Sequence, residues 1–152
     1  MDQSPGHGEV ALVSVHPDWA EAIVDGRKTV ELRRQAPKRP LDYVVVYSTS
    51  PVKRVVGWAP VREVVVGSPA SIWRTWGKSS GVPRATFRAY FSGTGTGYAI
   101  VLGPAVRLEE PMPLESLGLV RPPQSFQYLN GNADAVPGLA ADIDAAHRFT
   151  PV

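Results

Sequence analysis

Apolar and polar positions at the start of the chain predict a strand followed by a helix. Residues 10–15, with the sequence VALVSV, are apolar and β-branched, as expected of a buried strand. Pro17 then begins a helix, since proline is favoured in the first helical turn. The apolar residues between Trp19 and Val24 fall on one face of this helix. Gly26 ends the helix. The pattern therefore predicts a strand, a short helix and a turn.

The next segment, residues 28–34, alternates with period two, which indicates a strand. Val30 and Leu32 face one way, and Glu31 and Arg33 face the other. We therefore expect one face of this strand to enter the core and the other to carry charge.

The rest of the chain is rich in β-branched runs, and two segments that carry aromatic residues have a proline near a helix start. We expect residues 97–102 and 105–109 to pair with each other. This order predicts an α+β fold with a small mixed barrel-like sheet, a helix after the first strand and two short inserted helices. The predicted strands are 43–49, 52–66, 97–102 and 105–109, and the predicted inserted helices are 69–76 and 83–90.

The length of 152 residues fits one domain, which we place at residues 10–129. Residues 1–9 are polar and contain glycine and proline, so we expect a flexible tail. From residue 130 onward apolar periodicity is weak, so residues 130–152 are expected to form a peripheral or mobile tail. The chain has no cysteine, no signal-peptide pattern and no apolar run long enough to span a membrane, which favours a cytoplasmic protein.

Charge is distributed unevenly along the chain. Residues 26–88 contain 13 lysines and arginines against three acidic residues, a local net of +10, and the remainder has a net of −8. Binding to a polyanion requires clustered cations, so this asymmetry favours a nucleic-acid partner. We expect these cations to gather on one face beside the first helix. The alternative is that they are solvated side chains of ordinary strands and loops.

Several common site motifs are missing or lack the required context. The glycine-rich segment 93–97 precedes a strand, whereas a phosphate-binding loop precedes a helix. The three histidines have no spacing typical of metal ligands, and no serine nucleophile motif is present, so we expect no metal and no cofactor. Aromatic residues that could stack on a base, but that could equally fill the core, are Trp19, Trp58, Trp73, Tyr90 and Tyr128.

The segment GRKTVELRR, residues 26–34, carries one carboxylate among lysines and arginines. If Glu31 is buried in a pocket, Lys28 or Arg33 could offset the cost of removing its charge from water. A carboxylate held in this way can accept hydrogen bonds from the N–H edge of a base. The alternative is an ion pair on an exposed strand surface.

Several separate stretches of the chain together carry a family resemblance. The opening SVHPDWAEAIVDGRKTVELRR, residues 14–34, is similar to the strand, helix and charged strand that begin ASCH domains. Later pieces occur in the same order: YSTSP, VVGWAPV, SIW, FRAYFSGTGTGYAIVL and RPPQSFQYL, which together extend the resemblance over about residues 10–129.

The resemblance implies a PUA-like barrel with a cleft beside the first helix, related to domains that bind RNA or, in some members, DNA. Some ASCH proteins are similar to amidohydrolases that act on N4-acetylcytidine through a lysine and a threonine on this strand. Lys28 matches that lysine, but Glu31 stands where the threonine would be, so the proposed nucleophile is missing. Ribonuclease activity has also been attributed to some members.

We therefore expect a binding module for single-stranded RNA, DNA or a nucleotide. Lys28 and Arg33 would contact phosphate or carbonyl oxygens, and Glu31 would accept from a base. The alternatives are a small amidohydrolase or nuclease that uses Lys28 and Glu31, and a transcription-related protein-interaction module. The full set of expected binding residues, several of them implied by the resemblance, is Lys28, Glu31, Arg33, Arg34, Lys38, Arg39, Tyr47, Thr49, Gln124 and Ser125.

Overall fold

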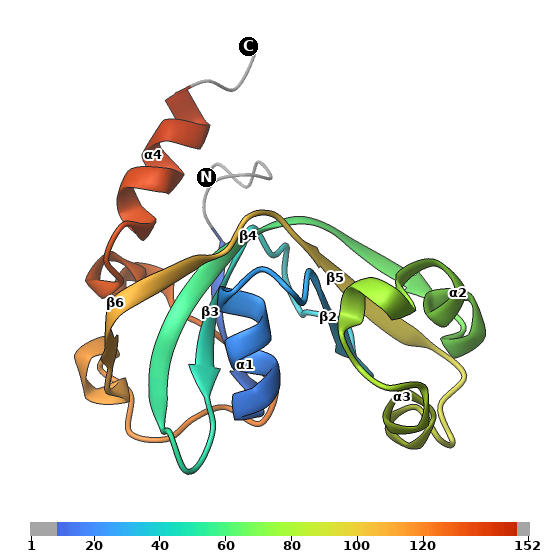
Figure 1. Ribbon diagram of the computed structural model, residues 1–152. Coiled ribbons are helices and arrows are strands. Elements are labelled where there is room, and N and C mark those ends of the chain that lie inside the picture. Colours follow the sequence, from blue (N-terminus) through green and yellow to red (C-terminus); the bar gives the residue numbers. More distant parts are fainter. Residues whose placement is uncertain (1–8, 149–152) are drawn as a thin grey trace.

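A computed structural model of the protein describes residues 9–148 and contains one mixed seven-stranded sheet with helices around it (Figure 1). The main path runs in the order β2-β5-β4-β3-β1-β7, and β6 pairs with β4 beside it. Of the pairs, only β1 with β3 is parallel. The strands are β1 (Val10–Val15), β2 (Val30–Arg33), β3 (Tyr43–Ser48), β4 (Arg54–Gly67), β5 (Gly97–Leu102), β6 (Val106–Met112) and β7 (Phe126–Tyr128).

Helices lie on both sides of this sheet, and the last one, α4, is at the C-terminal end of the chain. The predicted α+β class, with a mixed sheet, a helix after the first strand and two inserted helices, is confirmed. The described strands form an open path rather than a closed barrel, because β2 and β7 stand at its two ends. The helices are α1 (Pro17–Val24), α2 (Pro69–Ser80), α3 (Arg84–Tyr90) and α4 (Leu139–Arg148), and the 3₁₀ turns are η1 (Leu114–Leu117) and η2 (Asn130–Ala135).

The long strand β4 joins the two halves of the sheet. Its first half pairs with β3 and β6, and its second half pairs with β5, with a register shift in each ladder. Such shifts bend a strand and increase its twist. The expected pairing of residues 97–102 with residues 105–109 is wrong, because β5 and β6 each pair with a different part of β4.

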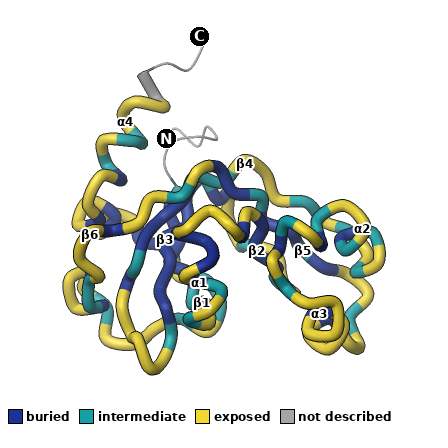
Figure 2. The backbone as a smooth tube through the Cα atoms, in the orientation of Figure 1, coloured by how far each residue is buried: buried dark blue, intermediate teal, exposed yellow. Residues whose placement is uncertain are grey.

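Three apolar clusters fill the space on either side of the sheet, and the central strands β1 and β3 are buried along almost their whole length (Figure 2). One cluster lies against α1, and a second lies on the opposite face beneath the C-terminal segment. The third joins β2 and β5 to α2 and α3, with Val30 and Leu32 among its buried residues. The core face predicted for the charged strand is therefore confirmed.

The C-terminal segment forms more regular secondary structure than its weak periodicity suggested. Residues 130–148 form η2 and α4, and Ala133, Val136 and Leu139 are buried against the sheet. Small apolar residues spaced by three are easily missed because they make a weak helical signal. Residues 1–8 and 149–152, the outer parts of the two predicted tails, lie outside the described residues. No helix within residues 9–148 is long and apolar enough to cross a membrane.

Candidate functional site

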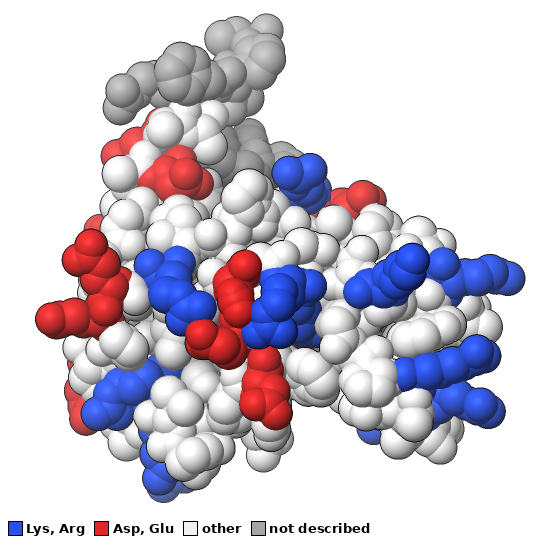
Figure 3. All heavy atoms as spheres, in the orientation of Figure 1, with Lys and Arg blue, Asp and Glu red and all other residues white. Residues whose placement is uncertain are grey.

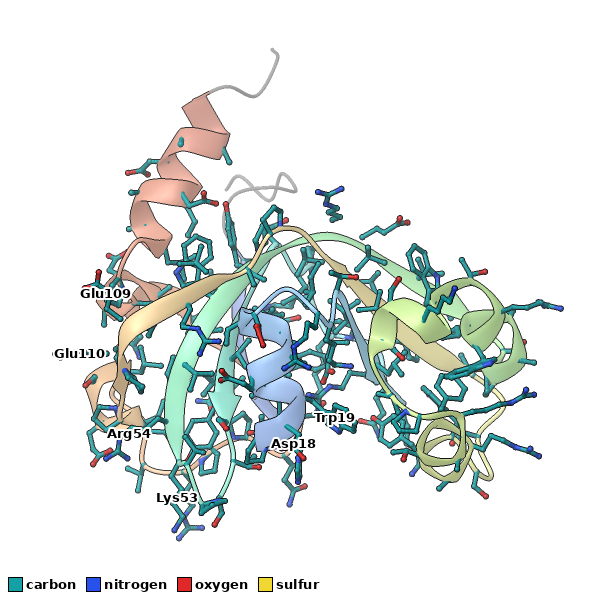
Figure 4. All side chains as sticks on the ribbon, in the orientation of Figure 1. Asp18, Trp19, Lys53, Arg54, Glu109 and Glu110 are labelled. Carbon is teal, nitrogen blue, oxygen red and sulfur yellow. The ribbon has the colours of Figure 1, made fainter. Side chains whose placement is uncertain are left out.

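A cavity of about 200 Å³ opens between α1, β2 and α3, and we call it the Lys28 cavity. Its charged lining comes from β2 and the residues just before it, and its large aromatic residues come from the two helices. Figure 4 shows the Trp19 side chain projecting from α1 toward α3. The lining residues are Ser14, Val15, His16, Trp19, Lys28, Glu31, Leu32, Arg33, Val82, Thr86, Phe87 and Tyr90.

Lys28 enters this cavity because it precedes the regular strand. Gly26 has φ +83°, a left-handed conformation that glycine adopts readily. The amides of Arg27 and Lys28 then both donate to the carbonyl of Ala22, at 2.9 and 3.0 Å, and the first ladder residue is Val30. Alternation along the strand therefore does not dictate the direction of the Lys28 side chain.

The Lys28 side chain is almost fully buried, with 2% of the residue exposed. Its ammonium donates a 2.6 Å hydrogen bond to the carbonyl of Ser80 at the end of α2 and lies 3.5 Å from Oε1 of Glu31. Its Nζ also lies 5.9 Å from the centre of the Trp19 ring. A buried ammonium needs such acceptors, because leaving water is costly for a charge.

Glu31 lies between two cations. Its Oε2 accepts a 2.6 Å hydrogen bond from Arg33, whose guanidinium also donates to the carbonyl of Ser14 at 2.9 Å. The guanidinium carbon lies 5.5 Å from the centre of the Phe126 ring. The Nε of Arg33 is buried and makes no hydrogen bond. Such unpaired buried donors are rare in folded proteins.

Burial and nearby charges shift the pKa values of Lys28 and Tyr90. Burial lowers the pKa of Lys28, Glu31 opposes this effect, and Arg33 adds to it. Burial also raises the pKa of the Tyr90 hydroxyl, and the nearby Arg33 opposes that shift. The site thus combines a carboxylate, two cationic groups and an aromatic hydroxyl in a small volume.

A second cavity of about 600 Å³, which we call the Arg34 cavity, adjoins the first. Arg33 and Tyr90 line both cavities. Arg34 meets Gln124 and Ser125 here, although these two residues lie about ninety positions further along the chain. All three were expected from the sequence. The lining is Arg33, Arg34, Gln35, Tyr90, Thr94, Gln124 and Ser125.

The structure places the remaining expected residues outside both cavities. Tyr47 is buried in the apolar cluster on the other face of the sheet. Thr49 lies in the turn after β3, where its carbonyl accepts from the amide of Val52. Arg39 pairs with Glu9 at 3.3 Å and stacks on Tyr128 at 4.1 Å from the ring centre, and Lys38 is exposed on the same loop.

The cations of residues 26–88 do not gather on one face. Lys53 and Arg54 lie on the far side of α1 from α2 and α3 (Figure 4). In Figure 3 basic side chains dominate the part of the surface formed by α2 and α3, and acidic ones are concentrated toward the opposite end. The expectation of one basic face beside α1 is therefore wrong, because Lys53 and Arg54, at the turn between β3 and β4, lie away from the basic side chains of α2 and α3.

Several lining groups escaped sequence reasoning. Ser14, His16 and Thr86 line the Lys28 cavity, and the carbonyl of Ser80 binds the lysine. The spacing of Thr86 and Tyr90, four residues apart on a helix, could have indicated a shared face. The Ser80 carbonyl had no sequence signal, because any residue at a helix end exposes a carbonyl. No group of three or more potential metal ligands occurs within residues 9–148.

Comparisons with known proteins place this geometry in context. Residues 13–103 match the ASCH domain family. A Zymomonas mobilis protein named ASCH domain-containing ribonuclease is 36% identical over 124 residues, covering 78% of this chain and 83% of that protein. A Ureaplasma parvum protein named large ribosomal subunit protein uL22 is 32% identical, covering 80% of this chain and 39% of its own length. A crystal structure of ASCH from Zymomonas mobilis has a TM-score of 0.78 and 32% identity, covering 84% of this chain and 92% of that chain.

Proposed function

Because this chain belongs to the ASCH domain family, we propose that it binds single-stranded RNA and holds one unpaired base or nucleotide in the Lys28 cavity. The similar Zymomonas mobilis protein is named a ribonuclease, which supports RNA as the ligand class. A charged cavity lined by aromatic side chains suits this ligand. Proteins recognise single-stranded RNA by stacking aromatic side chains on unpaired bases and by hydrogen bonds to the base edges.

The observation that carries the proposal is the Glu31 carboxylate held between Lys28 and Arg33 inside a cavity. A carboxylate fixed in this way accepts hydrogen bonds from a base N–H edge, and the Nη1 group of Arg33, which binds neither Glu31 nor Ser14, can donate to a carbonyl or phosphate oxygen. The volume of about 200 Å³ is below the roughly 300–1,000 Å³ of sites for drug-sized ligands. It therefore fits one base better than a longer segment.

The neighbouring Arg34 cavity binds the nucleotide next to that base. Arg34 is exposed there and can pair with a phosphate, and Gln124 can donate to a sugar or base. Arg39 is already held by Glu9 and Tyr128, so it contributes long-range attraction rather than a direct contact. Lys38, exposed on the same loop, has the same role. Tyr47 and Thr49 have no direct role in this proposal.

A second candidate function is hydrolysis, either of RNA or of a modified nucleoside. The specific observation in its favour is the lowered pKa of Lys28, because a larger neutral fraction of this amine can accept a proton from an attacking hydroxyl. Glu31 would orient the amine, and Arg33 would stabilise negative charge that develops on the attacked group. The ribonuclease name of the Zymomonas mobilis relative fits the first of these substrates.

The experiment is a titration of the purified protein with fluorescently labelled 12-nucleotide RNA, in single-stranded and duplex form, and with the matching DNA. We expect single-stranded RNA to bind most tightly and the affinity to fall as salt rises. Arg33→Gln should weaken binding at least tenfold, whereas Arg121→Gln, at an exposed arginine outside these cavities, should not. Equal affinity for duplex and single-stranded RNA would contradict the proposal.

Gel analysis of the same RNA, and chromatography of N4-acetylcytidine after incubation, test the hydrolytic candidate.

A further inference from the structure

Helix α3 presents three different faces to its surroundings. Thr86 and Tyr90 line the Lys28 cavity, and Phe87 is buried in the apolar cluster beneath the helix. Arg84 and Arg88, one turn apart, line a third cavity of about 540 Å³, which we call the Arg84 cavity. The full lining is Pro69, Ala70, Trp73, Arg74, Arg84, Phe87, Arg88, Phe91 and Thr94.

The charge of the Arg84 cavity is not balanced locally. The chain has no aspartate or glutamate between Glu63 and Glu109. Arg74, Arg84 and Arg88 are exposed, and none of them forms an ion pair with a residue in the described range 9–148. In Figure 3 the surface over α2 and α3 carries basic side chains. Three unpaired guanidinium groups around a concave surface favour an anionic ligand.

The three cavities form a continuous series through shared residues. Thr94 lines both the Arg84 and Arg34 cavities, and Arg33 and Tyr90 line both the Arg34 and Lys28 cavities. Aromatic contacts support the ridge between them: the Tyr90 and Phe91 rings are 4.8 Å apart between centres, and the Trp73 and Phe87 rings are 5.0 Å apart. Trp73 lines the Arg84 cavity itself, so it offers a surface for stacking.

We infer that the RNA strand whose base occupies the Lys28 cavity continues through the Arg34 cavity, past Thr94, and into the Arg84 cavity. There Arg74, Arg84 and Arg88 bind its phosphates, and Trp73 stacks on a flanking base. This path rests on the proposed function of the Lys28 cavity. It requires a single strand, because a positively charged groove combined with aromatic platforms is how proteins follow an unpaired backbone.

The test compares a 12-nucleotide single-stranded RNA with a trinucleotide of the same sequence, using labelled probes and the full-length protein. The variant is Arg84→Ala/Arg88→Ala, and the matched control is Arg54→Ala/Arg121→Ala, which removes two exposed arginines that line none of the three cavities. The 12-nucleotide RNA should bind the variant about tenfold more weakly than the control. The slope of log affinity against log salt should shrink by about 1.4, roughly 0.7 for each lost phosphate contact. Trinucleotide affinity should not change.

The outcomes separate this path from the proposed function. Equal affinity of variant and control for the 12-nucleotide RNA would overturn the path and leave the Lys28 cavity proposal standing. An equal loss of trinucleotide affinity would also overturn the path, because Arg84 and Arg88 would then act at the Lys28 cavity. If the wild-type protein binds neither RNA, the proposed function itself fails and the path fails with it.

Discussion

The Lys28 ammonium lies 3.5 Å from the carboxylate of Glu31, three positions further along the chain, and both residues are buried. The opposite oxygen of that carboxylate binds Arg33 at 2.6 Å. One negative charge therefore offsets two positive charges that have been removed from most of their water. Each member of this cluster depends on the others, because an unpaired buried charge is far more costly than a paired one.

Replacing Glu31 with glutamine should destabilise the fold. Lys28 and Arg33 would then face each other without a counter-charge, and we expect the free energy of unfolding to fall by about 2–3 kcal/mol. Urea unfolding followed by circular dichroism measures the change. Glu109→Gln, at an exposed glutamate on β6, is the matched control and should change stability by less than about 0.5 kcal/mol.

A double variant separates charge imbalance from loss of packing. Lys28→Met/Glu31→Gln removes one charge of each sign, so it should be more stable than Glu31→Gln alone. If the double variant is instead less stable by the sum of the two single effects, Lys28 and Glu31 do not interact energetically in the folded protein.

The stability conferred at Lys28 should depend on pH in a defined direction. Burial lowers its pKa in the folded state below the ordinary value of 10.5, so between these two values the unfolded chain binds more protons than the folded one. Stability of the wild type relative to Lys28→Met should therefore rise as pH increases from the folded-state pKa toward 10.5, and it should be constant below the folded-state pKa, where both states carry the proton. Parallel denaturant titrations of both proteins between pH 6 and 10 measure this difference. A difference that stays constant or falls with rising pH would show that burial does not lower this pKa.

Gly26 should be required for the position of Lys28. It has φ +83°, and a Cβ there would meet no atom within 4 Å, so alanine would strain the backbone without a clash. We expect Gly26→Ala to reduce the free energy of unfolding by about 1–2 kcal/mol and to weaken RNA binding. Gly131→Ala is the control, because it also meets no atom but has no left-handed φ. Equal stability of the two variants would exclude a special role for this turn.

Periodicity predicted the elements of the fold better than it predicted the site. Period-two alternation correctly assigned Val30 and Leu32 to the core, because successive side chains of a strand point to opposite faces of the sheet. The same rule would have sent Lys28 and Glu31 to opposite faces. The family resemblance favours their convergence, because Lys28 and Glu31 occupy the positions of a lysine and a threonine that act together, and the structure explains it through a left-handed turn before the strand.

Long-range features of the site had no local signal. Ser80 and Lys28, whose carbonyl and ammonium meet, are 52 positions apart in the chain. Gln124, just before β7, lines the same cavity as Arg34 although it is far from it in the sequence. Their meeting depends on how α2 and the segment before β7 pack on the sheet. Such packing depends on contacts between elements that periodicity within each element does not specify.

The C-terminal segment should contribute to the stability of the domain, although its weak sequence pattern suggested a peripheral tail. Leu139 at the start of α4 is fully buried against the sheet. The Tyr43 hydroxyl donates to Asp142 at 2.9 Å, and the Trp58 indole donates to the carbonyl of Pro137 at 3.0 Å, so this segment is tied to β3 and β4. Leu139→Ala should therefore lower the free energy of unfolding by about 2–5 kcal/mol, since it leaves a cavity in the core. Val120→Ala, at a residue that is 92% exposed, should change it by less than about 0.5 kcal/mol. If Leu139→Ala matches the Val120 control in urea unfolding, α4 contributes nothing to the stability of the domain and the segment behaves as an appendage in solution.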